Sequence, residues 1–167
     1  AVTGYNVYMD DGITGTPSSL VSCVGGAALD TTCIADGLTG GVSYSFQVSA
    51  SSTSGESDRS SVLAQATSPA AVGGTMTFSS VTMTSMTLTW TAPSGATPTG
   101  YIVYRDDGDA SAMPTPSIVV FEGDALTTTV TGLTGGTSYT YIVAALSGAG
   151  VGDVSATSTQ STSPAAP

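Results

Sequence analysis

A domain-sized segment occurs twice in this chain of 167 residues. Three motifs appear in both copies at an offset of 95 or 96 residues: GLTGGxSY at 37–44 and 132–139, GYxVYxDDG at 4–12 and 100–108, and SPAA at 68–71 and 163–166. A repeat of this length is a whole domain and not a short solenoid unit. The sequence therefore predicts a tandem array of two domains.

Apolar and polar residues alternate along the second copy. Met86, Leu88 and Trp90 fall on one face of an expected strand, and the threonines between them fall on the other. Pro, Gly and Asp separate this strand from other strand-like segments. These segments lie at 76–78, 101–105, 117–122, 127–131, 138–146 and 154–160. Seven strands without helical periodicity predict an all-β fold of the sandwich type.

Three features of this copy resemble the fibronectin type III family. They are Trp90 at the end of the second strand, GYIVY at 100–104, and the motif GLTxGxxY at 132–139. The resemblance implies two tandem seven-stranded fibronectin type III-like sandwiches with Trp90 in the core. It also implies that Leu133 and Tyr139 form the corner between the fifth and sixth strands. The family says little about function.

The first copy, placed at 1–69, is shorter than the second, placed at 70–167. It begins at the third strand and lacks the first two strands and the core tryptophan. Its remaining strands are expected to form one sheet and a lone fifth strand around 32–35. Either a longer chain supplies the missing strands, which is the favoured reading, or another molecule donates them. The inner face of this sheet is expected to be open to water at Tyr5, Val7, Phe46 and Val48.

Charge and composition exclude several functions. The chain carries 12 acidic residues, two arginines, no lysine and no histidine, for a net charge of −10. We expect no nucleic-acid partner, because there is no basic surface to displace phosphate counterions. No apolar run reaches the length of a membrane span, so no membrane insertion is expected. The usual general bases and activated nucleophiles are absent, so the chain is not expected to be an enzyme.

Cys23 and Cys33 are the only cysteines, and both lie in the first copy. An even number of cysteines in a short chain rich in Ser and Thr favours a disulfide and an oxidising compartment. Ser and Thr make up about a third of the sequence, as in O-glycosylated surface proteins. We therefore predict a Cys23–Cys33 disulfide, an extracellular or cell-surface location and O-linked glycans as possible attachments.

Acidic residues cluster in equivalent turns of the two copies. Asp106, Asp107 and Asp109 offer hard oxygen ligands that suit calcium, although their spacing is not that of an EF-hand loop. The favoured reading is a solvated turn, because Asp and Gly supply the backbone geometry of such loops. No cofactor is predicted, and these three residues are the candidate calcium ligands, with Glu122 or Asp124 as a further ligand nearby.

A set of apolar residues is expected on the outer face of the second domain. If the side chains of Tyr139, Tyr141, Val143 and Ala145 point inward, alternation turns their neighbours outward. The predicted interface patch is formed by Ile102, Tyr104, Ile142 and Leu146. The equivalent positions of the first copy are mostly polar: Asn6, Tyr8, Gln47 and Ser51.

These features favour a structural, self-associating extracellular protein. The prediction is a segment or subunit of a cell-surface filament, sheath or appendage, with copies of itself or neighbouring domains as partners. Low charge suits close packing, since few charges must be desolvated. The alternative is a spacer, accessory or carbohydrate-binding module of a larger secreted enzyme or adhesin.

Overall fold

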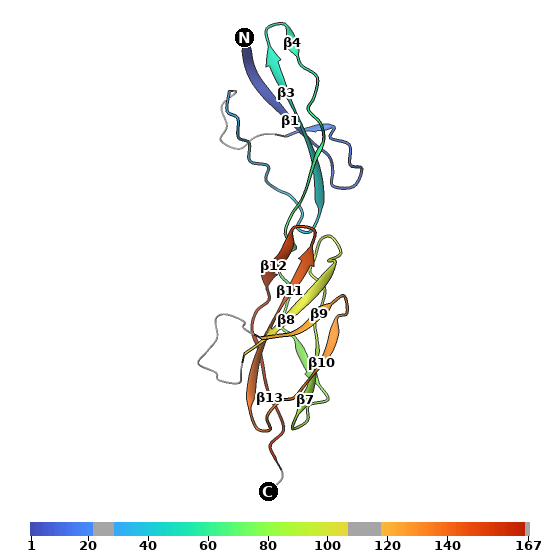
Figure 1. The fold of residues 1–167 in the computed structure, drawn as a ribbon, viewed down its shortest axis with the longest axis vertical. Helices are drawn as coiled ribbons and strands as arrows, with labels where there is room; N and C mark the ends of the chain where they lie inside the picture. Colours follow the sequence, from blue (N-terminus) through green and yellow to red (C-terminus); the bar gives the residue numbers. More distant parts are fainter. Residues whose placement is uncertain (22–28, 107–117, 166–167) are drawn as a thin grey trace. The chain divides into compact units, whose positions relative to one another are not determined.

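The computed structural model describes residues 1–21, 29–106 and 118–165 (Figure 1). The chain divides into two compact units, Ala1–Thr67 and Ser68–Pro167, so the predicted boundary lies two residues further along the chain. Every regular element in the described ranges is a β-strand, which confirms the all-β class. Among these residues no helix is long and apolar enough to cross a membrane.

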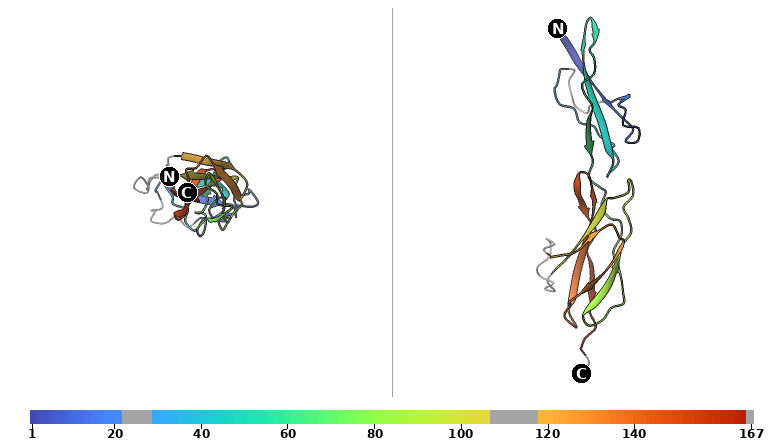
Figure 2. Two further views of the ribbon diagram at one scale, coloured as in Figure 1. Left: turned by 90° about the horizontal axis from the view of Figure 1, so that it is seen from below. Right: turned by 45° about the vertical axis from the view of Figure 1, so that its right-hand side comes forward.

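The second unit contains two antiparallel sheets. The smaller sheet has the order β10-β7-β6 and consists of β6 (Thr77–Ser79), β7 (Ser85–Thr89) and β10 (Thr127–Thr131). The larger sheet has the order β12-β11-β8-β9, and β13 also pairs with β11. Its strands are β8 (Gly100–Arg105), β9 (Ile118–Gly123), β11 (Ser138–Ser147), β12 (Gly150–Val154) and β13 (Ser158–Ser161). Figure 2 shows the green β7 facing the orange β11 across this unit.

The core of the second unit lies between these two sheets. From the smaller sheet, Met86, Leu88 and Trp90 are at most 4% exposed, as the alternation predicts. From the larger sheet, the core contains Tyr101, Val103, Tyr139, Tyr141, Val143 and Ala145. The Trp90 ring meets the Tyr101 ring edge-on at a centroid distance of 5.9 Å. The predicted inward register is therefore confirmed in both sheets.

Threonines cover the outer face of the smaller sheet. The Thr87 and Thr129 hydroxyls lie 3.1 Å apart on paired strands, and so do those of Thr89 and Thr127. Each of these hydroxyls is therefore paired across two strands, and such cross-strand threonine pairs stabilise the exposed face of a sheet.

The last strand differs from its prediction. The sequence predicts one strand at 154–160, whereas the structure has β12 and β13 with a break between them. At the break the Ser155 N–H donates to the Val143 carbonyl at 2.8 Å, and the Val143 N–H donates to the Ser155 hydroxyl at 3.1 Å. A side-chain hydroxyl thus replaces one backbone acceptor, as at an irregular position of a sheet edge.

The first unit consists of a single sheet in its described part. It has the order β2-β1-β3-β4, with β5 also paired to β3. In Figures 1 and 2 the blue β1 and the teal β3 form one layer. The strands are β1 (Val2–Met9), β2 (Ser19–Leu20), β3 (Ser43–Ser52), β4 (Gly55–Glu56) and β5 (Leu63–Ala66).

The predicted strand around 32–35 is wrong, because residues 30–36 carry no strand. The equivalent strand of the second unit, β10, pairs with β7. The described part of the first unit has no strand equivalent to β7. Because a strand needs a hydrogen-bonding neighbour strand, the absence of a β7 equivalent from the described part of the first unit explains why residues 30–36 form no strand.

A tyrosine fixes the same corner in both units. The Thr134 N–H donates to the Tyr139 hydroxyl at 3.0 Å, and the Thr39 N–H donates to the Tyr44 hydroxyl at 2.9 Å. Leu133 beside this corner is 4% exposed, which agrees with the role that the sequence resemblance implies. The same corner hydrogen bond therefore forms in the two-sheet second unit and in the first unit, whose described residues form one sheet.

Tyr141 is buried without a hydrogen-bond partner for its hydroxyl among the described residues. Its ring lies 5.8 Å from that of Phe78 across the core. Burial raises the pKa of Tyr141 to about 12, because the phenolate is poorly solvated there.

Cys33 is half-buried in the first unit, and Cys23 lies outside the described residues. The Cys23–Cys33 disulfide therefore stays a prediction.

We expect Tyr139→Phe to lower the unfolding free energy of the second unit by about 1 kcal/mol, because the Thr134 N–H loses its partner. Urea denaturation followed by the fluorescence of Trp90, the only tryptophan, measures this change. Tyr44→Phe is the matched control and should leave the Trp90 transition in place. An unchanged midpoint for Tyr139→Phe would show that the corner hydrogen bond contributes nothing.

Tyr141→Phe should cost little at neutral pH, since the hydroxyl has no partner to lose. In the unchanged protein the folded pKa exceeds the unfolded value of about 10, so stability falls as the pH rises from about 10 to 12. The variant should lose about 2 kcal/mol less over this interval. The dependence should be reduced and not abolished, because burial also raises the pKa of Tyr101. Identical pH profiles for the two proteins would contradict the argument.

The predicted disulfide is tested by titrating thiols in the denatured, unreduced protein. We expect no reactive thiol before reduction and two after it. The number of thiols is measured from the mass that the protein gains on alkylation. Cys23→Ser should expose one thiol and lower the stability of the first unit, because the crosslink restricts the unfolded chain. Two reactive thiols before reduction would rule the disulfide out.

Candidate functional site

The first aspartate of each acidic turn is buried and hydrogen-bonded to the neighbouring strand. Asp10 is 2% exposed, and its Oδ1 accepts hydrogen bonds from the Ser45 N–H at 3.0 Å and the Gly12 N–H at 3.1 Å. The equivalent Asp106 is also 2% exposed, and its N–H donates to the Thr140 carbonyl at 3.0 Å. Both residues therefore attach a turn to the neighbouring long strand.

Asp11 closes the exposed side of the first turn. Its Oδ1 accepts from the N–H groups of Ile13 and Thr14, both at 2.9 Å. The hydrogen bonds from Thr14 and Ile13 lower the pKa of Asp11. These contacts account for the Asp-Asp-Gly sequence as a turn motif.

The calcium prediction stays untested for most of its residues. Asp107 and Asp109 lie outside the described residues, and Asp106 is buried against β11. In the described ranges no three His, Cys, Asp or Glu side chains gather as a metal site would require.

The predicted interface patch lies on the paired strands β8 and β11. Ile142 faces Tyr104 across the pair, and Leu146 faces Gly100. Ile142 and its neighbour Ala144 are absent from the core cluster, as expected for the outward row. Ile142 is nevertheless only 3% exposed, because β11 has strands on both sides. The other three members, Ile102, Tyr104 and Leu146, are half-buried.

The outer face of the first unit carries a polar cluster instead. The Tyr8 hydroxyl donates to the Glu56 Oε1 at 2.6 Å, and the Ser49 hydroxyl donates to the same atom. The Arg59 guanidinium lies 3.5 Å from the centroid of the Tyr8 ring. Hydrogen bonds from Ser49, Tyr8 and Asn6, together with the charge of Arg59, lower the pKa of Glu56.

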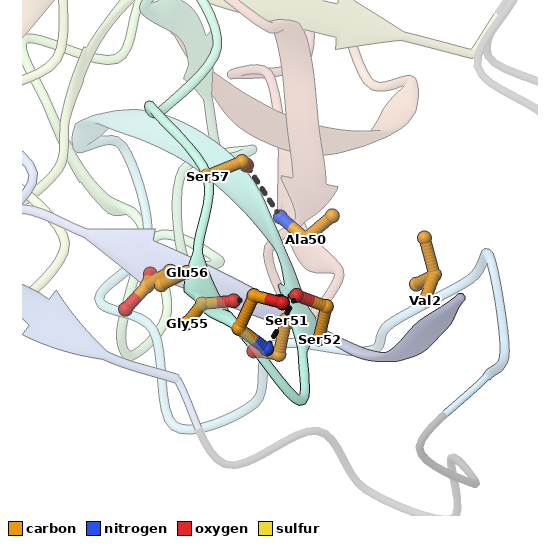
Figure 3. A pocket seen from close by; sticks show the side chains of 8 residues that line it. Val2, Ala50, Ser51, Ser52, Gly55, Glu56 and Ser57 are labelled. Atoms are coloured by element: carbon orange, nitrogen blue, oxygen red, sulfur yellow. Dashed lines mark hydrogen bonds between the residues drawn. The ribbon is translucent and has the colours of Figure 1, made fainter.

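A shallow hollow adjoins this cluster at the hairpin between β3 and β4. Its volume is about 370 Å³. Figure 3 shows Val2 standing apart from the hairpin residues, and a hydrogen bond of 3.0 Å from the Ala50 N–H to the Ser57 hydroxyl. The lining residues are Val2, Ala50, Ser51, Ser52, Ser54, Gly55, Glu56 and Ser57.

The arrangement does not suit catalysis. Glu56 is the only acid of the cluster, and its lowered pKa makes it a weak base. The sequence contains no histidine or lysine that would replace it. Sequence analysis missed the cluster, because Tyr8, Glu56 and Arg59 meet only when β1 and β3 pair. The one sequence signal for this cluster was the alternation along β1, which turns the Tyr8 side chain outward.

The inner face of the first unit is open, as predicted. Tyr5 is 41% exposed and Val48 is 42% exposed, while Val7 and Phe46 are half-buried. Side chains at the equivalent positions of the second unit are at most 4% exposed. The two units therefore differ in the exposure of this face.

Two curated bacterial proteins are similar to this chain over most of its length. Chitinase A1 of Niallia circulans is 32% identical over 159 residues, which cover 89% of this chain and 20% of that protein. Endoglucanase B of Cellulomonas fimi is 37% identical over 161 residues, which cover 90% of this chain and 14% of that protein. The chain thus spans a fifth or less of the length of these relatives.

A solved two-domain segment of chicken tenascin, described as fibronectin type III, has a similar fold. The TM-score is 0.60 at 20% identity, and the match covers 97% of this chain and 86% of that segment. At this identity the likeness concerns the fold alone. The family model for the fibronectin type III domain matches residues 70–161, which is more than half of the chain. Together with the paired sheets, the buried Trp90 and the tyrosine corner, this match shows that the chain belongs to the fibronectin type III family.

Proposed function

We propose that this chain is a non-catalytic spacer or accessory segment of a larger extracellular polysaccharide-degrading enzyme. One observation carries the proposal: nearly the whole chain matches a small part of two much longer proteins. One relative is named a chitinase and the other an endoglucanase. The segment matches both proteins, so its role does not depend on the polysaccharide by which their names differ.

The chemistry of the described residues supports this role. Outward hydroxyls of the second unit bond to one another, and the acidic turn of the first unit bonds to its own backbone. The surface over β7 and β10 is therefore uncharged and its hydroxyls are already paired, which leaves little to attract a polysaccharide or a membrane. Extracellular location and O-linked glycans on outward threonines belong to the same proposal.

A filament or sheath subunit is the second candidate. The open inner face of the first unit favours it, because exposed apolar faces mark contact sites. The burial of Ile142 weakens it, since the predicted patch on the second unit offers less surface. The two enzyme relatives give it no support.

An exchange of segments tests the spacer role. The matching segment of the Niallia circulans chitinase would be replaced by this chain, deleted, or replaced by a Gly-Ser linker of equal residue number. A spacer sets the distance between the parts that flank it. The chimera should therefore keep hydrolysis of insoluble chitin within about twofold of the parent, with a larger loss on deletion. All four proteins should hydrolyse soluble oligosaccharides equally.

Experiments on the 167-residue chain alone distinguish a spacer from a carbohydrate-binding module and from a filament subunit. Mixed with insoluble chitin or cellulose, it should remain in the supernatant and release no sugar. Retention on either polymer would favour a carbohydrate-binding module. Regular fibres in electron micrographs would favour the filament. A chimera no better than the deletion would overturn the spacer proposal.

A further inference from the structure

The outer face of the larger sheet of the second unit is apolar across four adjacent strands, β9, β8, β11 and β12 (Figure 1). The edge strands extend the predicted interface patch, because Val119, Val151 and Val154 pair with outward residues of β8 and β11. These three valines are 54%, 49% and 48% exposed, respectively. We call the four predicted residues together with the three valines the outer patch.

The fold does not require an apolar surface at these positions. In the first unit the equivalent face carries the polar cluster around Tyr8. At an offset of 95 residues, Val151 takes the position of Glu56 and Val154 takes the position of Arg59. The strand pairing agrees, because Glu56 and Val151 each face the equivalent residue of the neighbouring long strand. An exposed apolar patch where the sister domain has a polar cluster indicates a contact site.

Acidic side chains lie on both edges of the outer patch. Glu122 belongs to β9 and Asp153 belongs to β12, and both are exposed. Arg105 is the only basic residue of the second unit, and its guanidinium lies 4.9 Å from the ring centroid of Tyr139, a core residue. The margins of the patch are therefore negative. A partner that complements this surface is apolar at its centre and basic at its margins.

The outer patch is small. Neighbouring strands lie about 4.8 Å apart, so four strands place their outermost side chains about 14 Å apart. Three rows along the strands give a length of about 13 Å and hence an apolar area of roughly 200 Å². A stable interface buries about 800 Å² on each partner. The patch therefore depends on a favourable polar margin and suits a weak, transient complex.

A second copy of this chain does not supply such a margin. The chain contains no lysine and two arginines, and its net charge is −10. In a dimer formed through two outer patches, the Glu122 and Asp153 side chains of both copies would lie at the rim, where like charges oppose association. The partner is therefore a different protein.

We propose that the outer patch binds a separate protein that presents an apolar surface ringed by Lys or Arg. Tyr104 and the exposed valines contact the apolar centre, while Glu122 and Asp153 pair with basic side chains at the rim. Rim pairs of this kind raise the rate of association and weaken with salt. The proposal is independent of the spacer role, because it concerns what the second unit contacts and not the distance between flanking parts.

Three synthetic peptides separate the two parts of the partner's chemistry. The first alternates leucine and lysine, the second has serine in place of leucine, and the third has glutamate in place of lysine. Each is titrated into the isotope-labelled full chain, and the NMR shifts of amides in β8, β9, β11 and β12 report binding at the outer patch. We expect the Leu-Lys peptide to bind at least about tenfold more tightly than either of the others. Its affinity should fall as salt is added.

A pair of serine substitutions tests the apolar centre. Val119→Ser combined with Val154→Ser should lower the affinity for the Leu-Lys peptide at least about tenfold, because two exposed apolar side chains are lost from the patch. Leu126→Ser is the matched control, since Leu126 is 40% exposed and lies outside the patch. This control should bind the peptide within about twofold of the unchanged chain.

A charge reversal tests the margins without touching the apolar centre. Glu122→Lys combined with Asp153→Lys leaves a net charge of −6, because each substitution adds two positive charges to −10. Attraction to the chain as a whole would therefore still favour the lysine peptide. At the outer patch we expect the affinity for the Leu-Lys peptide to fall and that for the Leu-Glu peptide to rise, each at least about threefold.

Four results would overturn the proposal. The first is no binding of the Leu-Lys peptide at the outer patch. The second is equal binding of the Leu-Lys and Ser-Lys peptides, which would mean attraction to the net charge alone. The third is an affinity for the Leu-Lys peptide that neither pair of substitutions changes. The fourth is dimers in sedimentation of the peptide-free chain whose formation shifts the same amides, because a second copy would then occupy the patch.

Discussion

Burial of alternate side chains between two sheets is the contact on which the second unit depends. Met86, Leu88 and Trp90 project from a strand whose other side is threonine, and they meet the aromatic and aliphatic row of β8 and β11. Each strand has only one apolar side, so each sheet would expose an apolar face to water if the other did not cover it. Strand pairing, the tyrosine corner and the hydrogen bonds of the turns add to the stability that this contact between the sheets provides.

Local properties of the fold could be predicted from the sequence, whereas properties that depend on neighbouring strands could not. Period-two alternation predicts strands and the inward register of β7 and β11, because these are local properties of the chain. The strand expected at 32–35 fails, since a strand also requires a partner that the described first unit lacks. The burial of Ile142 and the meeting of Glu56 with Arg59 and Tyr8 were not predictable for a related reason. Both depend on which strands become neighbours.

The proposed function agrees with the hydrogen bonds that the carboxylates already make within the fold. Carboxylates at Asp10 and Asp11 accept backbone hydrogen bonds, and Glu56 accepts from Tyr8 and Ser49. A group committed to the fold is unavailable for chemistry on a substrate. The relatives agree with this interpretation, because the matched segment forms a minor part of each. These hydrogen bonds agree with the proposed spacer role, in which the chain supplies structure and not chemistry.

The tyrosine corner has a consequence for the order of folding. Tyr44 and Thr39 are five residues apart, and their hydrogen bond is present although the described residues of the first unit form only one sheet. The loop closed by this contact is very short, so its entropic cost is small. The corner can therefore form early during synthesis, before distant strands have emerged, and can hold the start of β3 in register for strands that arrive later. Loop-closure entropy thus favours an order in which the most local contact forms first and the sandwich core forms last.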